Sequence, residues 1–352
     1  MEERFDVPFA ELTTLRVGGP ARRLVSVDRS EELLPLLREL DAAGEPVLVL
    51  GGGSNLVVGD EGFAGTVLHT RWFDLHVVKE SHEHVVLRAV AGEVWDDVVS
   101  FSLAERWSGI EALSGIPGLV GATPIQNVGA YGQEVSDSIV AVEVYDRQRR
   151  RRRTLDPGDC AFGYRTSRFK QEPDRFVVLA VHYRLRRTPE SMPVRYPELA
   201  SSLGIELGGS VPVGRLRQAV LDLRRAKGMV LDVADHDTWS AGSFFTNPVL
   251  ADVDAERLPP DAPRWPAAEG RVKTSAAWLV EHAGFGRGAG GELTGSRATL
   301  STKHALAITN RGGATAADVL RLAAAVQGAV RERFGVELTP EPVVVTDASG
   351  GR

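Results

Sequence analysis

Hydrophobic positions along the chain follow helical spacing in some segments and strand-like alternation in others, with turn residues between them. A capping sequence at residues 28–31 precedes four leucines on one face of a predicted helix that ends near Gly44, at positions 33, 36, 37 and 40. Apolar runs of strand type follow at residues 47–50, 56–58 and 65–68. This order predicts a helix that leads into a sheet.

The pattern continues through residue 185. Residues 84–90 alternate as a strand, residues 94–103 have helical spacing, and residues 139–185 are rich in strand patterns. The first half of the chain is therefore predicted to be an α+β sheet domain. A change of composition at residues 186–193 predicts a linker.

Beyond the linker, helical spacing returns at residues 214–227 and 275–283, and a capping sequence at residues 315–318 begins a last long helix. The tail at residues 336–345 is predicted to be a strand, and its prolines favour the edge of a sheet. These elements lie beyond the predicted linker.

Two glycine-rich loops follow predicted strands. In the first, residues 51–55, β-type residues come after the glycines, so no helix N-terminus is available for a pyrophosphate and the loop N–H groups would have to bind it. The second, residues 115–132, holds five glycines, and Gln126 and Asn127 are its two adjacent amides. A single loop of this kind can be a plain turn. Two of them indicate a bulky ligand with a phosphate and a planar part, as in a flavin dinucleotide.

Composition narrows the class of protein. The 352 residues are 43% hydrophobic and 25% charged, with a net charge of −6, which argues against a general nucleic-acid binder. The arginine-rich run at 147–153 is predicted to be an exposed hairpin tip. Cys160 is the single cysteine, and the sequence shows neither a secretory leader nor an apolar stretch of about 18 residues. A cytoplasmic protein without membrane insertion is expected.

Three patterns suggest chemistry that their context does not support. Residues 286–291 match G-x-G-x-x-G but follow a helix, so a flexible loop is expected there. Residues 82–84 (His-Glu-His) and 235–237 (Asp-His-Asp) contain possible ligands without the spacing of metal ligands, so no metal site is predicted. No G-x-S-x-G sequence is present, and hydrolysis is unsupported.

Arg165, Ser243 and Glu341 lie in apolar or glycine-rich contexts, where each alone could serve a turn or an ion pair. Together with short motifs in order along nearly the whole chain, they make it resemble the UDP-N-acetylenolpyruvoylglucosamine reductases (UDP-N-acetylmuramate dehydrogenases) of bacterial wall synthesis. The motifs are at residues 12–20, 50–55, 124–132, 164–165, 242–248, 277–281, 303–305 and 340–341. Residues 190–232 resemble the longer form of this family, which has a tyrosine loop, although Lys227-Gly-Met departs from the commoner Lys-Leu-Pro.

The resemblance implies an α+β fold, with a two-part FAD-binding domain of the PCMH/vanillyl-alcohol-oxidase type and a separate α+β substrate-binding domain. The implied boundaries are residues 1–70 for the first FAD-binding subdomain, with 336–352 returning to it, residues 71–188 for the second, and residues 205–335 for the substrate domain.

The resemblance also implies the ligands and the site. Non-covalent FAD would be held by Gly51, Gly52, Gly53, Ser54, Asn55, Gln126, Asn127, Gly129 and Gly132. NADPH would be the co-substrate and UDP-N-acetylglucosamine enolpyruvate the substrate, which would meet Tyr131, Tyr164, Tyr196, Lys227 and Asn247. Neither nucleic acid nor an obligate protein partner is implied.

The implied reaction passes hydride from NADPH through FAD to the enolpyruvyl carbon. Arg165 would hold the substrate carboxylate, Glu341 would share in polarising it, and Ser243 would protonate the α carbon. Two alternatives stay open. A flavin oxidase of the same fold often tethers its cofactor through a histidine on the first glycine loop, and residues 51–55 contain none. A catalytically silent ligand-binding module would have no need for Arg165, Ser243 and Glu341 together.

Overall fold

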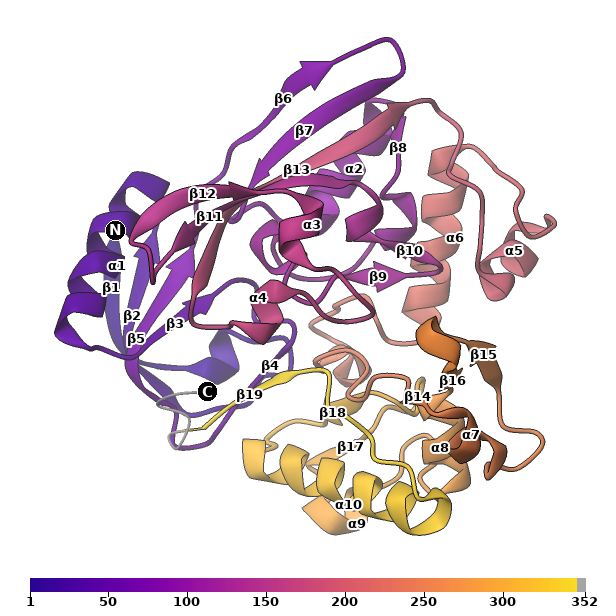
Figure 1. The fold of residues 1–352 in the computed structure, drawn as a ribbon. Coiled ribbons are helices and arrows are strands. Elements are labelled where there is room, and N and C mark those ends of the chain that lie inside the picture. The colour runs from indigo at the N-terminus through magenta and orange to yellow at the C-terminus, as the bar shows by residue number, and fades with distance from the viewer. Residues whose placement is uncertain (347–352) are drawn as a thin grey trace.

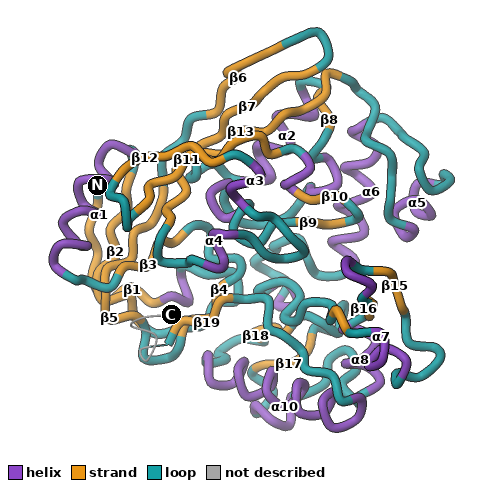
Figure 2. Tube along the Cα trace, in the orientation of Figure 1, coloured by secondary structure: helices purple, strands orange, loops and turns teal. Residues whose placement is uncertain are grey.

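The computed structural model describes residues 1–346, which form three regions with strands of their own (Figures 1 and 2). The first region is a four-stranded sheet in the order β1-β2-β5-β3, made of Glu2–Pro8, Pro20–Val27, Phe63–Thr70 and Val47–Leu50. β1 is antiparallel to β2, and the other neighbours are parallel. Among residues 1–346, no helix has both the length and the apolar character needed to span a bilayer.

Helix α1 (Ser30–Ala43) confirms the predicted leucine face, because all four leucines are buried. It ends at Gly44, whose φ of 67° is left-handed and suits glycine. The predicted side-chain cap is absent: Arg29 occupies the N-cap and makes no capping hydrogen bond. The helix is therefore held by burial of its apolar face.

The second region is a larger antiparallel sheet in the order β12-β11-β13-β7-β6, with β8 paired to β13. Its strands are β6 (Leu75–Glu80), β7 (His84–Val90), β8 (Trp107–Ser108), β11 (Ile139–Asp146), β12 (Arg151–Leu155) and β13 (Phe176–Arg187). Helices α2 (Trp95–Ala104), α3 (Pro157–Cys160) and α4 (Arg168–Gln171) and the pair β9 (Gly129–Ala130) and β10 (Gln133–Glu134) complete it.

The third region packs α10 (Ala316–Phe334) against small strands and short helices, at the lower right of Figure 1. These are β14 (Val249–Leu250), α7 (Asp252–Glu256), β15 (Arg264–Pro266), β16 (Val272–Thr274), α8 (Ala276–His282), α9 (Gly291–Thr294), β17 (Ala298–Leu300) and β18 (Ile308–Asn310). Single-turn 3-10 helices occur in all regions: Phe9–Glu11, Glu111–Leu113, Val120–Ala122, Val135–Asp137, His236–Thr238 and Ala268–Gly270. The predicted capping sequence of α10 is confirmed, since Thr315 and Asp318 cap each other's N–H groups.

Helix α6 (Val213–Ala226) forms where predicted but packs differently from the implied domain division. With α5 (Pro197–Leu203) it shares a core with Ala112 of the second region, and Arg217 makes a two-pronged ion pair with Asp96 at 2.7 and 2.8 Å. The segment implied to begin the substrate domain at residue 205 is thus attached to the second region up to the end of α6.

The tail prediction was wrong in extent. Only β19 (Val343–Val345) is a strand, parallel to β4 (Leu56–Val58), while Val336 and Leu338 pack in the core of the third region. Pro340 and Pro342 have no N–H to give to a ladder, which delays the strand. The chain therefore returns to the first region at Val343; residues 347–352 of the implied return lie outside the described residues.

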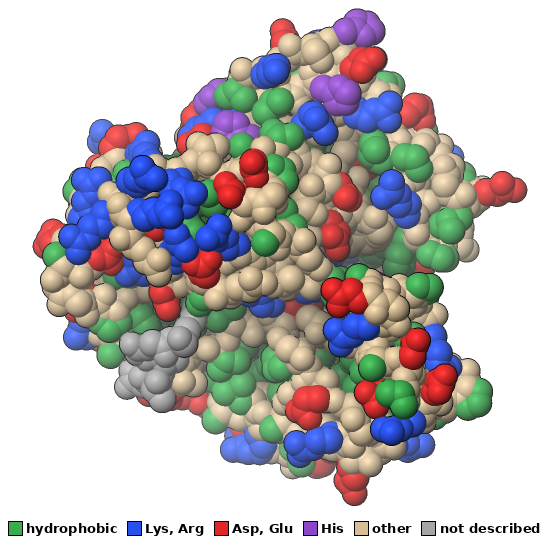
Figure 3. All heavy atoms as spheres, in the orientation of Figure 1, with side chains coloured by type: hydrophobic (Ala, Val, Ile, Leu, Met, Phe, Trp, Pro, Cys, Tyr) green, Lys and Arg blue, Asp and Glu red, His purple; other side chains and the backbone are tan. Residues whose placement is uncertain are grey.

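The arginine-rich tip is also shorter than predicted. Strand β12 begins at Arg151 and leads into α3, whose N-cap is Asp156. Arg147 pairs with Asp41 of α1, and Arg153 pairs with Asp146, so the ends of the run are fixed by carboxylates. Figure 3 shows basic side chains gathered over this hairpin and the neighbouring α1.

Candidate active site

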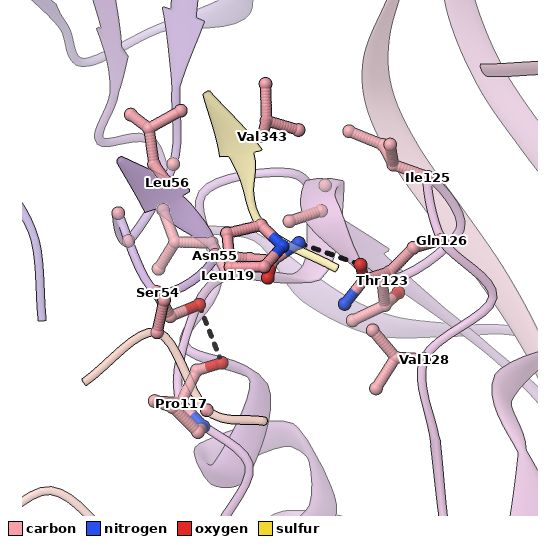
Figure 4. Close-up of a pocket in the computed structure, with 18 of the residues that line it drawn as sticks. Ser54, Asn55, Leu56, Pro117, Leu119, Thr123, Ile125, Gln126, Val128 and Val343 are labelled. Atoms are coloured by element: carbon pink, nitrogen blue, oxygen red, sulfur yellow. Dashed lines mark hydrogen bonds between the residues drawn. The ribbon is translucent and has the colours of Figure 1, made fainter. Parts of the chain in front are cut away.

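A cavity of about 580 Å³ lies between the two glycine loops and reaches the third region. Its walls come from β3, from both loops and from the segments around residues 165, 243 and 341. Figure 4 shows apolar side chains, among them Leu56, Leu119, Val128 and Val343, around a few polar groups. Mostly apolar walls with few polar groups are typical of cofactor pockets of this size.

The first glycine loop lines this cavity and has unpaired backbone donors. Within residues 1–346, none of the backbone N–H groups of residues 51–55 donates a hydrogen bond, whereas the carbonyls of Gly53 and Asn55 accept from Thr14 and Val343. Successive free N–H groups in a turn form an anion-binding nest. The loop is therefore suited to a phosphate, as predicted.

The two loops touch backbone to backbone. A Cβ on Gly52 would lie 2.8 Å from the Cα of Gly118, and one on Gly53 would lie 2.0 Å from the carbonyl oxygen of Leu12. The Ser54 hydroxyl donates to the Pro117 carbonyl at 3.2 Å, and Asn55 Nδ2 donates to Gln126 Oε1 at 2.8 Å, as Figure 4 shows. Glycine is thus needed for close approach, and the polar pairs lock the loops together.

Arg165 and Glu341 form an ion pair at the cavity, with Nε 3.1 Å from Oε1. Arg165 has a φ of 52°, a conformation uncommon outside glycine that is found at functional sites, and its Nη2 donates to Gly129 O at 2.7 Å. Burial raises the pKa of Glu341 above the usual carboxyl value, against the opposing effect of Arg165 and Lys170. A proton can therefore reside on Glu341 more readily than on an exposed carboxyl.

Ser243 lines the same cavity because its segment is held between two others. Phe244 N donates to Leu306 O at 2.7 Å, and Glu341 N donates to Phe244 O at 2.9 Å. The carbonyl of Glu341 also accepts from Asn55 Nδ2 at 3.3 Å. The three predicted catalytic residues, far apart in sequence, thus line one cavity beside the first loop.

Two predicted cofactor-binding residues lie elsewhere. The Asn127 side chain is buried and donates to Glu134 Oε2 and Gly163 O, and its Oδ1 accepts from Ser136 N, so its amide is used within the protein. Gly132 and Tyr131 line a smaller hollow on the other side of this segment. The geometry does not support direct contact of Asn127 or Gly132 with a ligand in the main cavity; Gly51–Asn55, Gln126 and Gly129 do line it.

The predicted substrate-side residues also lie outside its walls and form two groups. Tyr131 and Tyr196 meet edge to face with ring centroids 5.5 Å apart, and Lys227 lies 5.9 Å from the Tyr131 ring centre while pairing with Glu198 at 2.6 Å. Tyr164 lies against Lys273 of β16, and Asn247 Oδ1 accepts from Ala276 N at the start of α8.

Sequence reasoning did not single out Arg224 as a site residue. It lines the main cavity from the end of α6, one Nη donates to Met229 O at 2.8 Å, and its buried Nε has no partner within the described residues. A buried guanidinium with a free donor is suited to an anionic ligand. The sequence does show a basic run at residues 224–227, Arg-Arg-Ala-Lys. The run alone does not show which of its basic side chains faces the cavity.

Comparisons with known proteins agree with this geometry. Residues 234–345 match the profile of the UDP-N-acetylenolpyruvoylglucosamine reductase C-terminal domain, and residues 21–153 match an FAD binding domain. The chain is 53% identical to UDP-N-acetylenolpyruvoylglucosamine reductase of Thermobifida fusca, over 97% of both proteins. It is 52% identical to the Cutibacterium acnes enzyme of that name, over 97% of this chain and 89% of that protein. The chain belongs to the UDP-N-acetylenolpyruvoylglucosamine reductase family.

A solved structure extends the agreement. The crystal structure of UDP-N-acetylenolpyruvylglucosamine reductase from Thermus caldophilus superposes with a TM-score of 0.66 at 27% identity, covering 98% of each chain. The family membership confirms the predicted α+β fold and makes the protein an FAD-dependent oxidoreductase. Among the described residues, no group of three or more His, Cys, Asp or Glu could hold a metal.

The residues present fit the FAD of a UDP-N-acetylenolpyruvoylglucosamine reductase. Free N–H groups of residues 51–55 suit a diphosphate, and the unpartnered Arg224 Nε provides a further cationic donor in the same cavity. The apolar walls suit flat ring systems.

Replacement of Gly52 by alanine should weaken FAD binding. The new Cβ would meet the Gly118 backbone at 2.8 Å and push the loops apart, so we expect the affinity for FAD to fall at least about tenfold. The measurement is titration of the apoprotein with FAD, followed by quenching of flavin fluorescence. Gly328→Ala in α10, where a Cβ meets nothing within 4 Å, is the matched control and should bind as the parent does. Equal affinity of the Gly52→Ala protein would show that the loop contact does not shape the site.

Proposed function

We propose that this protein catalyses the NADPH-dependent, FAD-mediated reduction of UDP-N-acetylglucosamine enolpyruvate to UDP-N-acetylmuramate, a step of peptidoglycan biosynthesis. The observation that carries the proposal is the convergence of Arg165, Ser243 and Glu341 on the cavity beside the nest-forming loop. The family membership supports the same reaction.

Arg165 is proposed to hold the carboxylate of the enolpyruvyl group. Its guanidinium fork can donate hydrogen bonds to two carboxylate oxygens, and negative charge that moves onto the carboxylate during reduction is stabilised by this fixed cation. Glu341, at 3.1 Å from Arg165, shares in this when it carries a proton and donates to the same oxygens. The upward shift of the Glu341 pKa favours that protonation state.

Ser243 is proposed to give its hydroxyl proton to the α carbon. A serine hydroxyl is a weak acid, but a carbanion next to a carboxylate is a strong base, so transfer requires positioning above all. That positioning comes from the backbone pairing of residue 244 with residue 306 and of residue 341 with residue 244.

Tyr131, Tyr164, Tyr196, Lys227 and Asn247 are proposed to bind the UDP part of the substrate. Lys227, now paired with Glu198 and close to the Tyr131 ring, provides a cation that a diphosphate can engage. Since these side chains lie outside the walls of the main cavity, we propose that the α5 segment moves with Tyr196 when substrate binds.

Gly51–Asn55, Gln126 and Gly129 are proposed to hold FAD non-covalently, and FAD bound there would supply the hydride-transfer chemistry between NADPH and the substrate. We propose the division into residues 1–70 with residues 336–352 returning to them, residues 71–188, and a substrate-binding domain of residues 205–335 whose first helix, α6, packs on the second region. We also propose a cytoplasmic protein that needs no nucleic acid, membrane insertion or obligate protein partner. The single, buried Cys160, which cannot form an intrachain disulfide, agrees with a reducing compartment.

The test is NADPH oxidation by the purified yellow protein with and without UDP-N-acetylglucosamine enolpyruvate, with the product identified by mass. Oxidation that requires the enolpyruvyl substrate supports the proposal. Oxidation that requires only oxygen would place the protein among flavin oxidases, and an inert, colourless protein would favour a ligand-binding module. Repetition with NADH measures the preference for the phosphorylated nucleotide.

A further inference from the structure

The imidazole of His304 lies against the Ser243 hydroxyl. His304 Nε2 is 3.5 Å from Ser243 Oγ, and His304 N donates to Ser301 Oγ at 3.3 Å. The hydrogen bond from Phe244 N to Leu306 O holds the two segments in register next to this contact. The serine and the histidine are therefore placed together by the backbone.

The surroundings keep His304 neutral. Burial, helped by the positive charges of Lys227 and Arg287, lowers the pKa of His304 to about 4, and Glu198 opposes this only in part. A neutral imidazole has one N–H donor and one acceptor nitrogen. Nδ1 has no hydrogen-bond partner within residues 1–346, and it is not fully buried, so solvent can reach it. One ring nitrogen thus faces the serine and the other is open to water.

We propose that His304 is a positioning residue that orients the Ser243 hydroxyl and returns a proton to it after each turnover. The inference rests on the proposed function, in which Ser243 donates to the substrate. When the Ser243 O–H bond breaks and the C–H bond forms, the serine oxygen keeps the negative charge. The Nε2–H of His304 then protonates that oxygen while Nδ1 takes a proton from water, so the ring changes tautomer and stays neutral. Exchange with water restores the first tautomer, and one solvent proton is consumed per turnover.

Two variants of His304 separate proton return from simple packing. His304→Gln keeps a hydrogen-bonding side chain that cannot change tautomer, and His304→Ala leaves space for free imidazole. The steady-state rate with saturating NADPH and UDP-N-acetylglucosamine enolpyruvate is measured without oxygen, because the proton returned to Ser243 after one turnover is needed for the next. We expect kcat of both variants to be at least about tenfold lower. Reduction by NADPH and the dissociation constant of UDP-N-acetylglucosamine, measured by calorimetry, should not change.

Added imidazole should accelerate the His304→Ala protein in proportion to its concentration and leave the parent unchanged. His82→Gln, in the exposed turn between β6 and β7, is the matched control and should have the parent rate. A parent rate for His304→Gln, or a slow His304→Ala protein that imidazole does not accelerate, would overturn the assignment while Ser243 remains the donor. Failure of the parent itself to react with the enolpyruvyl compound would instead overturn the proposed function.

Discussion

Ser243→Ala should lose at least about a hundredfold in the rate at which substrate reoxidises the reduced flavin, because the general acid is removed and water cannot replace it in a positioned transfer. FAD binding and reduction by NADPH should persist, since no loop contact depends on the hydroxyl: its single hydrogen-bond contact within residues 1–346 is with His304. Rapid mixing of each half-reaction makes the measurement.

The matched control for Ser243→Ala is Ser100→Ala. Ser100 is exposed on α2, and alanine is well tolerated in a helix, so stability and both rates should match the parent. Retention of the full substrate rate by Ser243→Ala would identify another proton donor.

Arg165→Met should lower the substrate-dependent rate by roughly a hundredfold to a thousandfold, the usual effect of removing a group that stabilises developing negative charge. Substrate affinity should fall too, because the carboxylate loses its cation. Arg165→Lys should not restore the rate, since an ammonium cannot reproduce the two-pronged geometry of a guanidinium. Steady-state kinetics with varied enolpyruvyl substrate separates the effects on kcat and KM.

Loss of Arg165 also leaves the Glu341 carboxyl buried without its partner at 3.1 Å. Its pKa should rise further, so the protein remains folded by protonating Glu341 instead of burying a bare charge. The double variant Arg165→Met, Glu341→Gln provides the check: it should unfold at a similar temperature to Arg165→Met and be no more active. Recovery of activity in the double variant would contradict a stabilising role for Arg165.

The features that could be predicted are those for which a short stretch of sequence determines both the residue type and the local backbone conformation. Gly52 and Gly53 indicate close backbone contact, because only glycine fits at these positions. The leucine face of α1 indicates which side of the helix is buried. Arg165, Ser243 and Glu341 were predicted through ordered motifs, and the structure brings them to one cavity.

The remaining features depend on contacts between distant segments. Asn127 sits in a glycine-rich loop like a ligand-binding amide, yet Glu134 and the Gly163 carbonyl consume its donors. The apolar stripe of helix α6 packs with Ala112, about a hundred positions earlier in the chain. The spacing of apolar residues within the helix therefore does not show that the helix packs on the second region. Arg224 matters because, within residues 1–346, its buried Nε has no hydrogen-bond partner, which no local sequence pattern reveals.

Strand β19 has a consequence for the order in which the protein matures. It pairs in parallel with β4, and Val343 N donates to the Asn55 carbonyl, so residues made late in translation complete a loop made early. A nascent chain that ends before residue 341 has the phosphate nest but neither Glu341 nor this strand. FAD can therefore be captured in its finished site only after the ribosome has produced nearly all of the described chain, and a truncation before Val343 should yield protein that loses its flavin during purification.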